Sequence, residues 1–392
     1  MKKIGYFMGA ALLTLGSCTN EINEEGFVDK ANTISFNAYS NKTRAVTGDV
    51  TSENIKGDNF GVFGYYNNSP YLYVLENTTK KAVKQKWNST SSNWEYVNPS
   101  ELKFWPDGSM DFYAYFPSSE NVTFEESNAN SNVMTISNVD CSRDVLFAKH
   151  TTSYIERVPL TFYHAFSKIK KVNVSIGNDT EKGYVKDAGV SVEIQKVEFI
   201  NTSTSGTVKV DNGGVASYEV ASTNVTLSKD LSSSLVTVNS TELTGTLIDN
   251  STSGGYLFAT TSESTATKNV KGTGKTMWDG TNTSWAEGTT LENLGQVCLK
   301  LTCKVWNGPD INKYYYVGGD GDNYGEVYIP LQGTDSNSNS VTTFEAGKRY
   351  TYNIVFKNNV GFKVNGDPIL TPILFNVSSV IGWEDVNVTI TL

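Results

Sequence analysis

The chain is poor in the side chains that perform most enzyme chemistry. It has two histidines, His150 and His164, among 392 residues. Neither an HExxH pattern nor a paired-cysteine spacing is present, so the sequence gives no recognisable zinc site. The G-x-S-x-G elbow of many hydrolases is missing too. We therefore expect no enzymatic activity, no cofactor and no metal site, and we interpret His164 as a buried structural histidine within a strand.

Positive charge is also scarce, and arginine most of all. The chain has 32 basic and 41 acidic residues, which gives a formal net charge of −9. Only four of the basic residues are arginines: Arg44, Arg143, Arg157 and Arg349. No cluster of basic residues is visible, so nucleic acid is not expected as a partner. An arginine-specific protease would find few sites to cleave.

Cysteines are too few for a disulfide scaffold in a chain of this length. The four are Cys18, Cys141, Cys298 and Cys303. In a strand, Cys298 and Cys303 would point to opposite faces, because side chains alternate with a period of two. We expect these two and Cys141 to be small buried apolar residues rather than disulfide partners.

Long apolar runs are missing beyond the first 17 residues, and so are helix-favouring stretches. No later segment approaches the ~20 apolar residues of a bilayer-spanning helix. Serine, threonine, asparagine, glycine and valine are abundant instead, together with 21 tyrosines and 18 phenylalanines. β-branched and aromatic residues favour strands, and asparagine, glycine, aspartate and serine favour turns. The composition predicts an all-β protein.

The N-terminus is the one apolar segment, and it reads MKKIGYFMGAALLTLGSC. Two lysines precede an apolar core at 4–15 that is too short for a permanent membrane span. The core ends in Leu15-Gly16-Ser17-Cys18, which resembles a bacterial lipobox. We predict that residues 1–17 are a signal peptide and that Cys18 is acylated, which would anchor the chain in the outer membrane. The alternative is an ordinary secretory signal with a chance cysteine.

Both ends of the remaining chain carry a strict strand pattern. Apolar residues alternate with polar ones there, as expected for a strand with one buried face. The first set is Ile34, Phe36 and Ala38, and the second is Val386, Val388, Ile390 and Leu392.

Short strands recur between these ends at the spacing typical of β-sandwiches. The length favours two domains rather than one. The segment 158–176 reads as two strands, or one bent strand, with a break near 165–168. We place a domain boundary near residue 157, with an N-terminal β-sandwich at 45–157 and a C-terminal one at 158–392.

Two surface features leave alternatives open. The segment Asp320-Gly321-Asp322 begins like a calcium-binding loop, but Leu331 stands where such a loop needs a bidentate glutamate. A hairpin loop is favoured, with a weak calcium site as the alternative. Tyrosines and tryptophans are either core residues of the sandwiches or platforms for sugars.

Several short motifs, taken in order, resemble those of the Bacteroidales fimbrillin family, the subunits of type V pili. Besides the lipobox at Cys18, the motifs are Ile34-Ser35-Phe36, Thr43-Arg44-Ala45, Phe60–Tyr65, Phe104–Gly108, Asp111–Pro117, Leu160–Ile169, Ala346–Tyr350 and Ile381-Gly382-Trp383. The resemblance extends over nearly the whole chain.

This resemblance implies two tandem transthyretin-like β-sandwich domains and a cell-surface pilus subunit. It implies that an arginine-specific protease cleaves the Arg44–Ala45 bond and removes residues 18–44, the lipidated tether and the first strand. Ile34, Phe36 and Ala38 would belong to that displaced strand. A second pilin would then insert its own strand, for which Val386–Leu392 is the candidate donor in this chain.

Two alternatives accompany this hypothesis. Val386–Leu392 is equally compatible with an ordinary last strand of its own domain, as expected for a tip or anchor subunit that does not polymerise. The chain is also compatible with a surface lipoprotein that binds a glycan or a host or bacterial ligand.

Overall fold

The computed structural model describes most of the chain, and the described part is all-β. Two short 3-10 turns, Asn54–Gly57 and Pro99–Glu101, are its only helical segments, and none of its helices is long and apolar enough to cross a membrane. The all-β prediction is confirmed. The described residues are 33–40, 50–155, 157–176, 190–220, 225–239, 241–242, 244–251, 254–258, 297–307, 313–331, 333–334, 340–341, 343–356, 374–376, 384–386 and 389–390.

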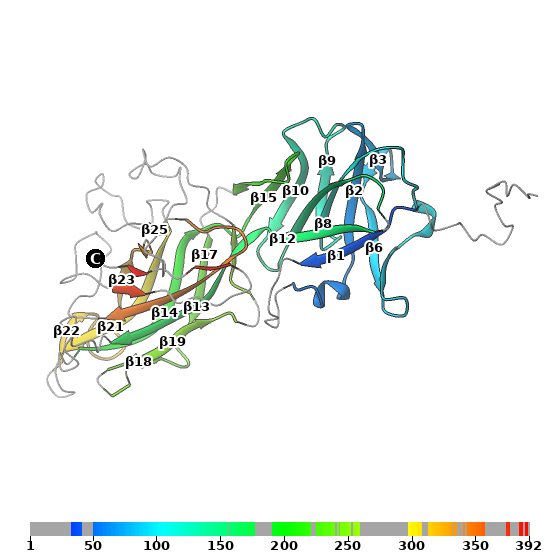
Figure 1. Cartoon of the computed structure of the whole chain (residues 1–392). Helices are drawn as coiled ribbons and strands as arrows, with labels where there is room; N and C mark the ends of the chain where they lie inside the picture. The colour runs from blue at the N-terminus through cyan, green and yellow to red at the C-terminus, as the bar shows by residue number, and fades with distance from the viewer. Residues whose placement is uncertain are drawn as a thin grey trace, which may run out of the picture.

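An eight-stranded sheet forms the centre of the first half (Figure 1). Its order is β1-β12-β11-β8-β2-β6-β7, and β3 pairs with β2 off this path. The edge strand β1 runs parallel to β12, whereas β11, β8, β2 and β6 pair antiparallel with their neighbours. The strands are β1 (Phe36–Ser40), β2 (Phe60–Tyr66), β3 (Ser69–Leu72), β6 (Val83–Asn88), β7 (Asn93–Tyr96), β8 (Met110–Phe116), β11 (Leu146–Thr152) and β12 (Val158–His164).

A four-stranded sheet of order β16-β15-β10-β9 packs against one face of this sheet. A separate two-stranded hairpin, β4–β5, completes the first half. The strands are β4 (Val74–Glu76), β5 (Thr79–Lys81), β9 (Asn121–Phe124), β10 (Asn132–Asp140), β15 (Ser205–Asp211) and β16 (Ala216–Val220).

A nine-stranded and a six-stranded sheet form the second half, with one apolar core that draws on both. The larger sheet has the order β19-β13-β26-β27-β29-β24-β25, with β20 on β13 and β28 on β26; the smaller has the order β17-β14-β21-β22, with β18 on β14 and β23 on β21. The larger sheet contains β13 (Phe166–Ile176), β19 (Thr244–Asp249), β20 (Tyr256–Phe258), β24 (Gly333–Thr334), β25 (Ser340–Val341), β26 (Lys348–Phe356), β27 (Leu374–Asn376), β28 (Glu384–Val386) and β29 (Thr389–Ile390). The smaller contains β14 (Val190–Thr202), β17 (Val225–Asp230), β18 (Val236–Val238), β21 (Cys298–Asn307), β22 (Tyr314–Val317) and β23 (Gly325–Ile329).

Both faces of the eight-stranded sheet are buried, because alternate residues of its strands enter two different cores. Phe63 and Tyr113 belong to the core shared with the four-stranded sheet. Phe60 and Phe112 belong to a second core, which is lined by β1, β7 and β12 of the same sheet. This second core lies on the concave face of the curled eight-stranded sheet, so the edge strands of that sheet help to enclose the core.

The chain passes three times between the two halves, the last time between β16 and β17 (Figure 1). It leaves the eight-stranded sheet at His164 and enters the nine-stranded sheet at Phe166. After β14 it returns as the β15–β16 hairpin, which pairs with β10 in the first half. The predicted break near 165–168 is therefore observed at Ala165, whereas the division into domains at residue 157 stays a prediction.

Candidate functional site

The described residues offer little that resembles a catalytic centre. No group of three or more histidine, cysteine or carboxylate side chains lies close enough together there to hold a metal ion. The predicted structural histidine is confirmed, since His164 is buried and its Nδ1 lies 2.7 Å from Asp144 Oδ2. Cys298 and Cys303 are buried free thiols, and Cys141 is a half-buried one.

The loop at Asp320–Asp322 connects β22 and β23, which both pair antiparallel with β21, one after the other, and not with each other. The hairpin interpretation is therefore wrong, because the loop joins two consecutive parts of one side of β21. The backbone of this loop contacts the positively charged side chain of Lys304. The ammonium of Lys304 donates a hydrogen bond to the carbonyl oxygen of Gly321 and lies 4.2 Å from the centre of the Tyr324 ring. Asp320 accepts a hydrogen bond of 3.0 Å from the hydroxyl of Tyr315.

The most distinctive feature is the place of the first strand, which we call the β1 seat. Three alternating side chains of this segment point into the core within the curled sheet: Ile34, Phe36 and Ala38 are 0%, 1% and 6% exposed. Tyr39, which follows Ala38 on the opposite face of the strand, is 49% exposed. The alternation read from the sequence therefore matches the two faces of the strand.

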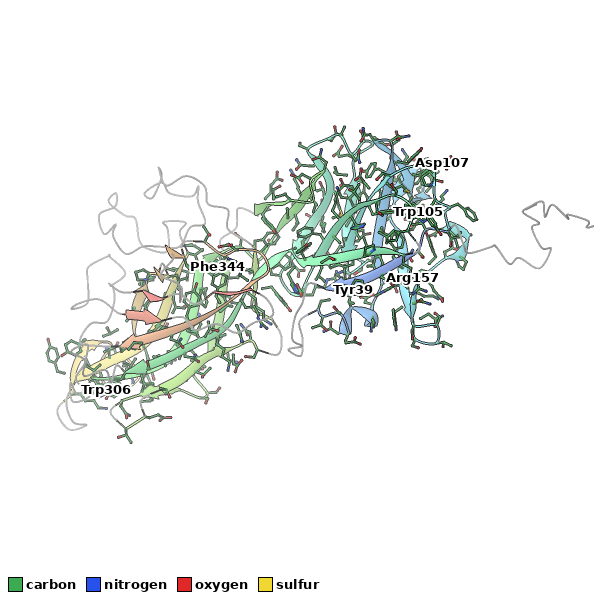
Figure 2. The ribbon with its side chains drawn as sticks, in the orientation of Figure 1. Tyr39, Trp105, Asp107, Arg157, Trp306 and Phe344 are labelled. Carbon is green, nitrogen blue, oxygen red and sulfur yellow. The ribbon has the colours of Figure 1, made fainter. Side chains whose placement is uncertain are left out.

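Aromatic rings surround the central side chain of the β1 seat. The Phe36 ring meets Phe112 edge to face at 5.5 Å and Phe60 at 6.3 Å between ring centroids. Edge-to-face pairs of this kind add to the free energy gained by burial. Figure 2 shows Trp105 and Arg157 at the end of the seat where β1 begins and Tyr39 at the end where it finishes.

Backbone hydrogen bonds hold β1 mainly from one side. Residues Phe36–Ser40 are in parallel register with Val158–Phe162 of β12, and the Val158 N–H donates to the Ser35 carbonyl at 2.8 Å. Only the start of the segment is bonded on the other side, where Thr33 forms a bridge with Phe104. From Phe36 onwards, β1 is the edge strand of its sheet among the residues that the structure describes.

Ile34 is the residue bonded on that second side. Its N–H donates to the carbonyl oxygen of Lys103 at 2.9 Å, and its own carbonyl accepts from the Tyr96 hydroxyl at 3.0 Å. Burial raises the pKa of Tyr96, and a backbone hydrogen bond with Lys103 lowers it by less. The Tyr96 hydroxyl is therefore neutral and a hydrogen-bond donor at physiological pH.

The chain is fixed again soon after β1. The Val50 N–H donates to Asp144 Oδ2 at 3.2 Å, and this is the carboxylate oxygen that contacts His164. Because Asp144 and His164 are both buried, they anchor the chain at residue 50 independently of β1. Arg44 and Ala45, the predicted cleavage site, lie between the two anchors and outside the described residues, as does Cys18.

The predicted donor segment is described only in part. Val386 is the last residue of β28, which runs parallel to β26, and Ile390 belongs to β29, where it pairs with Phe375 of β27. Val388 and Leu392 lie outside the described residues. The described parts of this segment thus pair with strands of their own chain.

The sequence predicted the buried face of β1 but not the groups that hold its backbone. Tyr96 and Lys103 are each more than sixty positions away from Ile34, whose backbone they bond. Nothing in local periodicity indicates such contacts, because a period of two defines faces and not partners.

Comparison with known proteins places the chain in a family. A family model described as fimbrillin-like matches residues 43–367. Among solved structures, a fimbrial protein from Bacteroides vulgatus is 15% identical, with 90% of this chain and 99% of that chain covered and a TM-score of 0.48. A candidate cell adhesion protein from Parabacteroides distasonis is 10% identical, with 90% and 97% covered and a TM-score of 0.48.

No protein of curated function matches the chain. The family model alone covers well over half of the 392 residues, and it agrees with the all-β architecture described above. The chain therefore belongs to the fimbrillin-like family.

Proposed function

We propose that this protein is a structural and adhesive subunit of a cell-surface pilus that polymerises by exchanging strands at the β1 seat. It is exported as a lipoprotein acylated at Cys18 and anchored in the outer membrane. An arginine-specific protease then cleaves the Arg44–Ala45 bond. The observation that carries the proposal is a deeply buried first strand that is an edge strand, held mainly by β12, and followed closely by an arginine.

The free energy of an empty seat supports strand exchange. Full burial of side chains such as Ile34 and Phe36 contributes about 1.5–3 kcal/mol each. If β1 left, the core lining would meet water and the backbone groups of β12 would lose their partners. An open sheet edge next to an apolar groove favours the addition of another strand.

The C-terminal segment has the pattern that such a seat accepts. Val386, Val388 and Ile390 would enter the core, and the polar residues between them would face outwards. Each subunit would then offer one seat and one strand. Because the two surfaces differ, the contact is head-to-tail, and repeating it generates a filament as long as the rotation between neighbours does not close a ring.

Arg44 is the natural candidate among the four arginines. Arg349 is 2% exposed within β26, and Arg143 forms an ion pair with Glu120 at 2.5 Å. Arg157 directly precedes Val158, whose N–H is bonded to the β1 segment. Cleavage at Arg349 or Arg157 would require folded structure to open first, whereas Arg143 is exposed in the turn between β10 and β11 and is the competing site.

The test is the mass and N-terminal sequence of the protein on its native cells, compared between the natural chain and Arg44→Ala. We expect a natural chain that begins at Ala45 and runs as high-mass ladders in SDS, and an Arg44→Ala chain that stays monomeric and begins at acylated Cys18. Arg143→Ala is the matched control and should assemble normally. A natural chain that keeps Cys18 and stays monomeric would contradict the proposal.

One observation favours a second candidate function, that of a tip or anchor subunit that accepts a strand but donates none. Residues of the candidate donor already pair within their own chain, in β28 and β29. Such a subunit would be cleaved at Arg44 and found in pili at low copy number. Deleting 386–392 would then leave its incorporation unchanged, whereas a shaft subunit would lose polymerisation.

A further inference from the structure

We propose that the Tyr96 hydroxyl and the Lys103 carbonyl, which we call the clamp, determine the direction and the depth of any strand in the β1 seat. Depth here means how far along the seat the strand extends. An incoming C-terminal segment of a second copy would accordingly run parallel to β12, with Val386 at the position of Ile34. The clamp itself is a property of the intact chain. Its use in assembly rests on the proposed function.

The clamp consists of two polar groups that act on one residue. The Lys103 carbonyl accepts from the Ile34 N–H at 2.9 Å, and the Tyr96 hydroxyl donates to the Ile34 carbonyl at 3.0 Å. Tyr96 is 9% exposed and Ile34 is fully buried. Both bonds therefore lie away from water, where an unmatched donor or acceptor costs more than a hydrogen bond contributes.

The order of these two groups along the strand selects a direction. In a β-strand, the N–H and C=O of one residue point to the same side, and reversing the strand exchanges their order. A reversed strand would place a carbonyl opposite the Lys103 carbonyl, where two acceptors repel each other. The apolar pockets cannot make this distinction, because alternating side chains look the same in either direction.

The clamp also selects depth. β12 bonds any strand laid beside it, but only a strand that reaches the Ile34 position satisfies Tyr96 and Lys103. The segments Ile34–Ser40 and Val386–Leu392 each span seven residues and share the same alternation. With Val386 in the clamp, Val388 takes the place of Phe36 and Ile390 that of Ala38. The donor then fills the whole seat.

The first experiment uses the intact chain and needs no assembly. Tyr96→Phe removes the clamp hydroxyl and keeps the ring. Tyr65→Phe is the matched control, because the Tyr65 hydroxyl donates to the Glu125 carbonyl at 2.7 Å and its ring belongs to the core on the other face of the sheet. Amide hydrogen exchange is measured for the segment 33–40. We expect about five- to tenfold faster exchange in Tyr96→Phe, as the loss of one hydrogen bond implies, and no change in Tyr65→Phe. Equal exchange in both variants would overturn the clamp.

The second experiment reads the direction in assembled subunits by disulfide trapping. Parallel insertion brings residue 391 of the donor next to Thr161, since it then replaces Tyr39. Reversed insertion over the same seat brings residue 391 next to Arg157 instead. We expect intersubunit disulfides in ladders of the Thr391→Cys/Thr161→Cys chain and none in the Thr391→Cys/Arg157→Cys chain. Ladders linked by the second pair would overturn the proposed direction while leaving strand exchange intact.

The third experiment reads the depth with two proline substitutions in the donor. Val386→Pro removes the N–H that would meet Lys103. Val388→Pro removes an N–H that would point to the open edge beyond β1, where proline is tolerated. We expect Val386→Pro to reduce ladder formation at least tenfold more than Val388→Pro, and equal effects would contradict the predicted depth. A failure of all chains to form ladders would contradict the proposed function, with the clamp still judged by hydrogen exchange.

Discussion

The residue that best shows how this protein holds its first strand is Phe36. Its ring is 1% exposed and lies between Phe60 and Phe112, in a core closed by the strand that carries it. Tyr39, three positions later, projects to solvent. The strand therefore has one apolar face that is buried in the core and one face that is exposed to solvent.

This difference between neighbours leads to a prediction. Phe36→Ala should lower the free energy of unfolding by about 3–5 kcal/mol, because truncation of a buried ring removes its burial and leaves a cavity. Tyr39→Ala, on the exposed face of the same strand, should change it by less than about 0.5 kcal/mol. Chemical denaturation of the intact chain measures both values. Similar losses in the two variants would mean that Phe36 is not the central contact of the seat.

At the scale of elements, the sequence predicts faces well and partners badly. The alternation at Ile34, Phe36 and Ala38 indicated the buried face, and the break near 165–168 marked the end of β12. The sequence did not indicate that β1 would pair in parallel with β12, more than a hundred residues away. A strand of period two fits beside any strand of the same pattern, so only the folded chain determines which neighbour it has.

The β15–β16 hairpin is the clearest case of an unpredicted partner. It follows β14 in the second half, yet Val208 and Val210 enter the core of the first half together with Met134 of β10. Its local pattern reads as two ordinary strands. The change of sheet leaves no trace in periodicity, because β14 ends at Thr202 and β15 begins at Ser205 after a turn that is compatible with either half.

The hairpin therefore predicts that a substitution within β15 destabilises the first half, although β14 before it and β17 after it belong to the second half. Val208→Asp should lower the free energy of unfolding by more than about 4 kcal/mol, because it buries an unpaired charge. Val215→Asp makes the same replacement at a position that is 66% exposed between β15 and β16 and should have little effect.

Hydrogen exchange locates the damage. Protection should fall first in β10 and β8, which share the core of Val208, while β14 and β21 keep theirs. Loss of protection confined to β14 and β21 would instead assign the hairpin to the second half of the molecule.

At the scale of the whole molecule, the net charge of each subunit affects its approach to the next subunit. After cleavage at Arg44, the remaining chain has 27 basic and 37 acidic residues, a formal charge of −10. The segment Val386–Leu392 carries no ionisable side chain, so its contacts in the β1 seat are apolar and backbone contacts. Repulsion between subunits should therefore affect their encounter and not the stability of the inserted strand.

This separation predicts how assembly depends on salt. The Debye length falls from about 30 Å at 0.01 M ionic strength to about 8 Å at 0.15 M, so added salt screens the repulsion between two approaching subunits. Assembly of the Arg44-cleaved chain, followed by light scattering, should become severalfold faster over this range, while the dissociation rate of formed ladders stays constant. If assembly slowed with salt, oppositely charged patches at the two ends of the subunit would have to steer the encounter, and the net charge of the chain would not govern it.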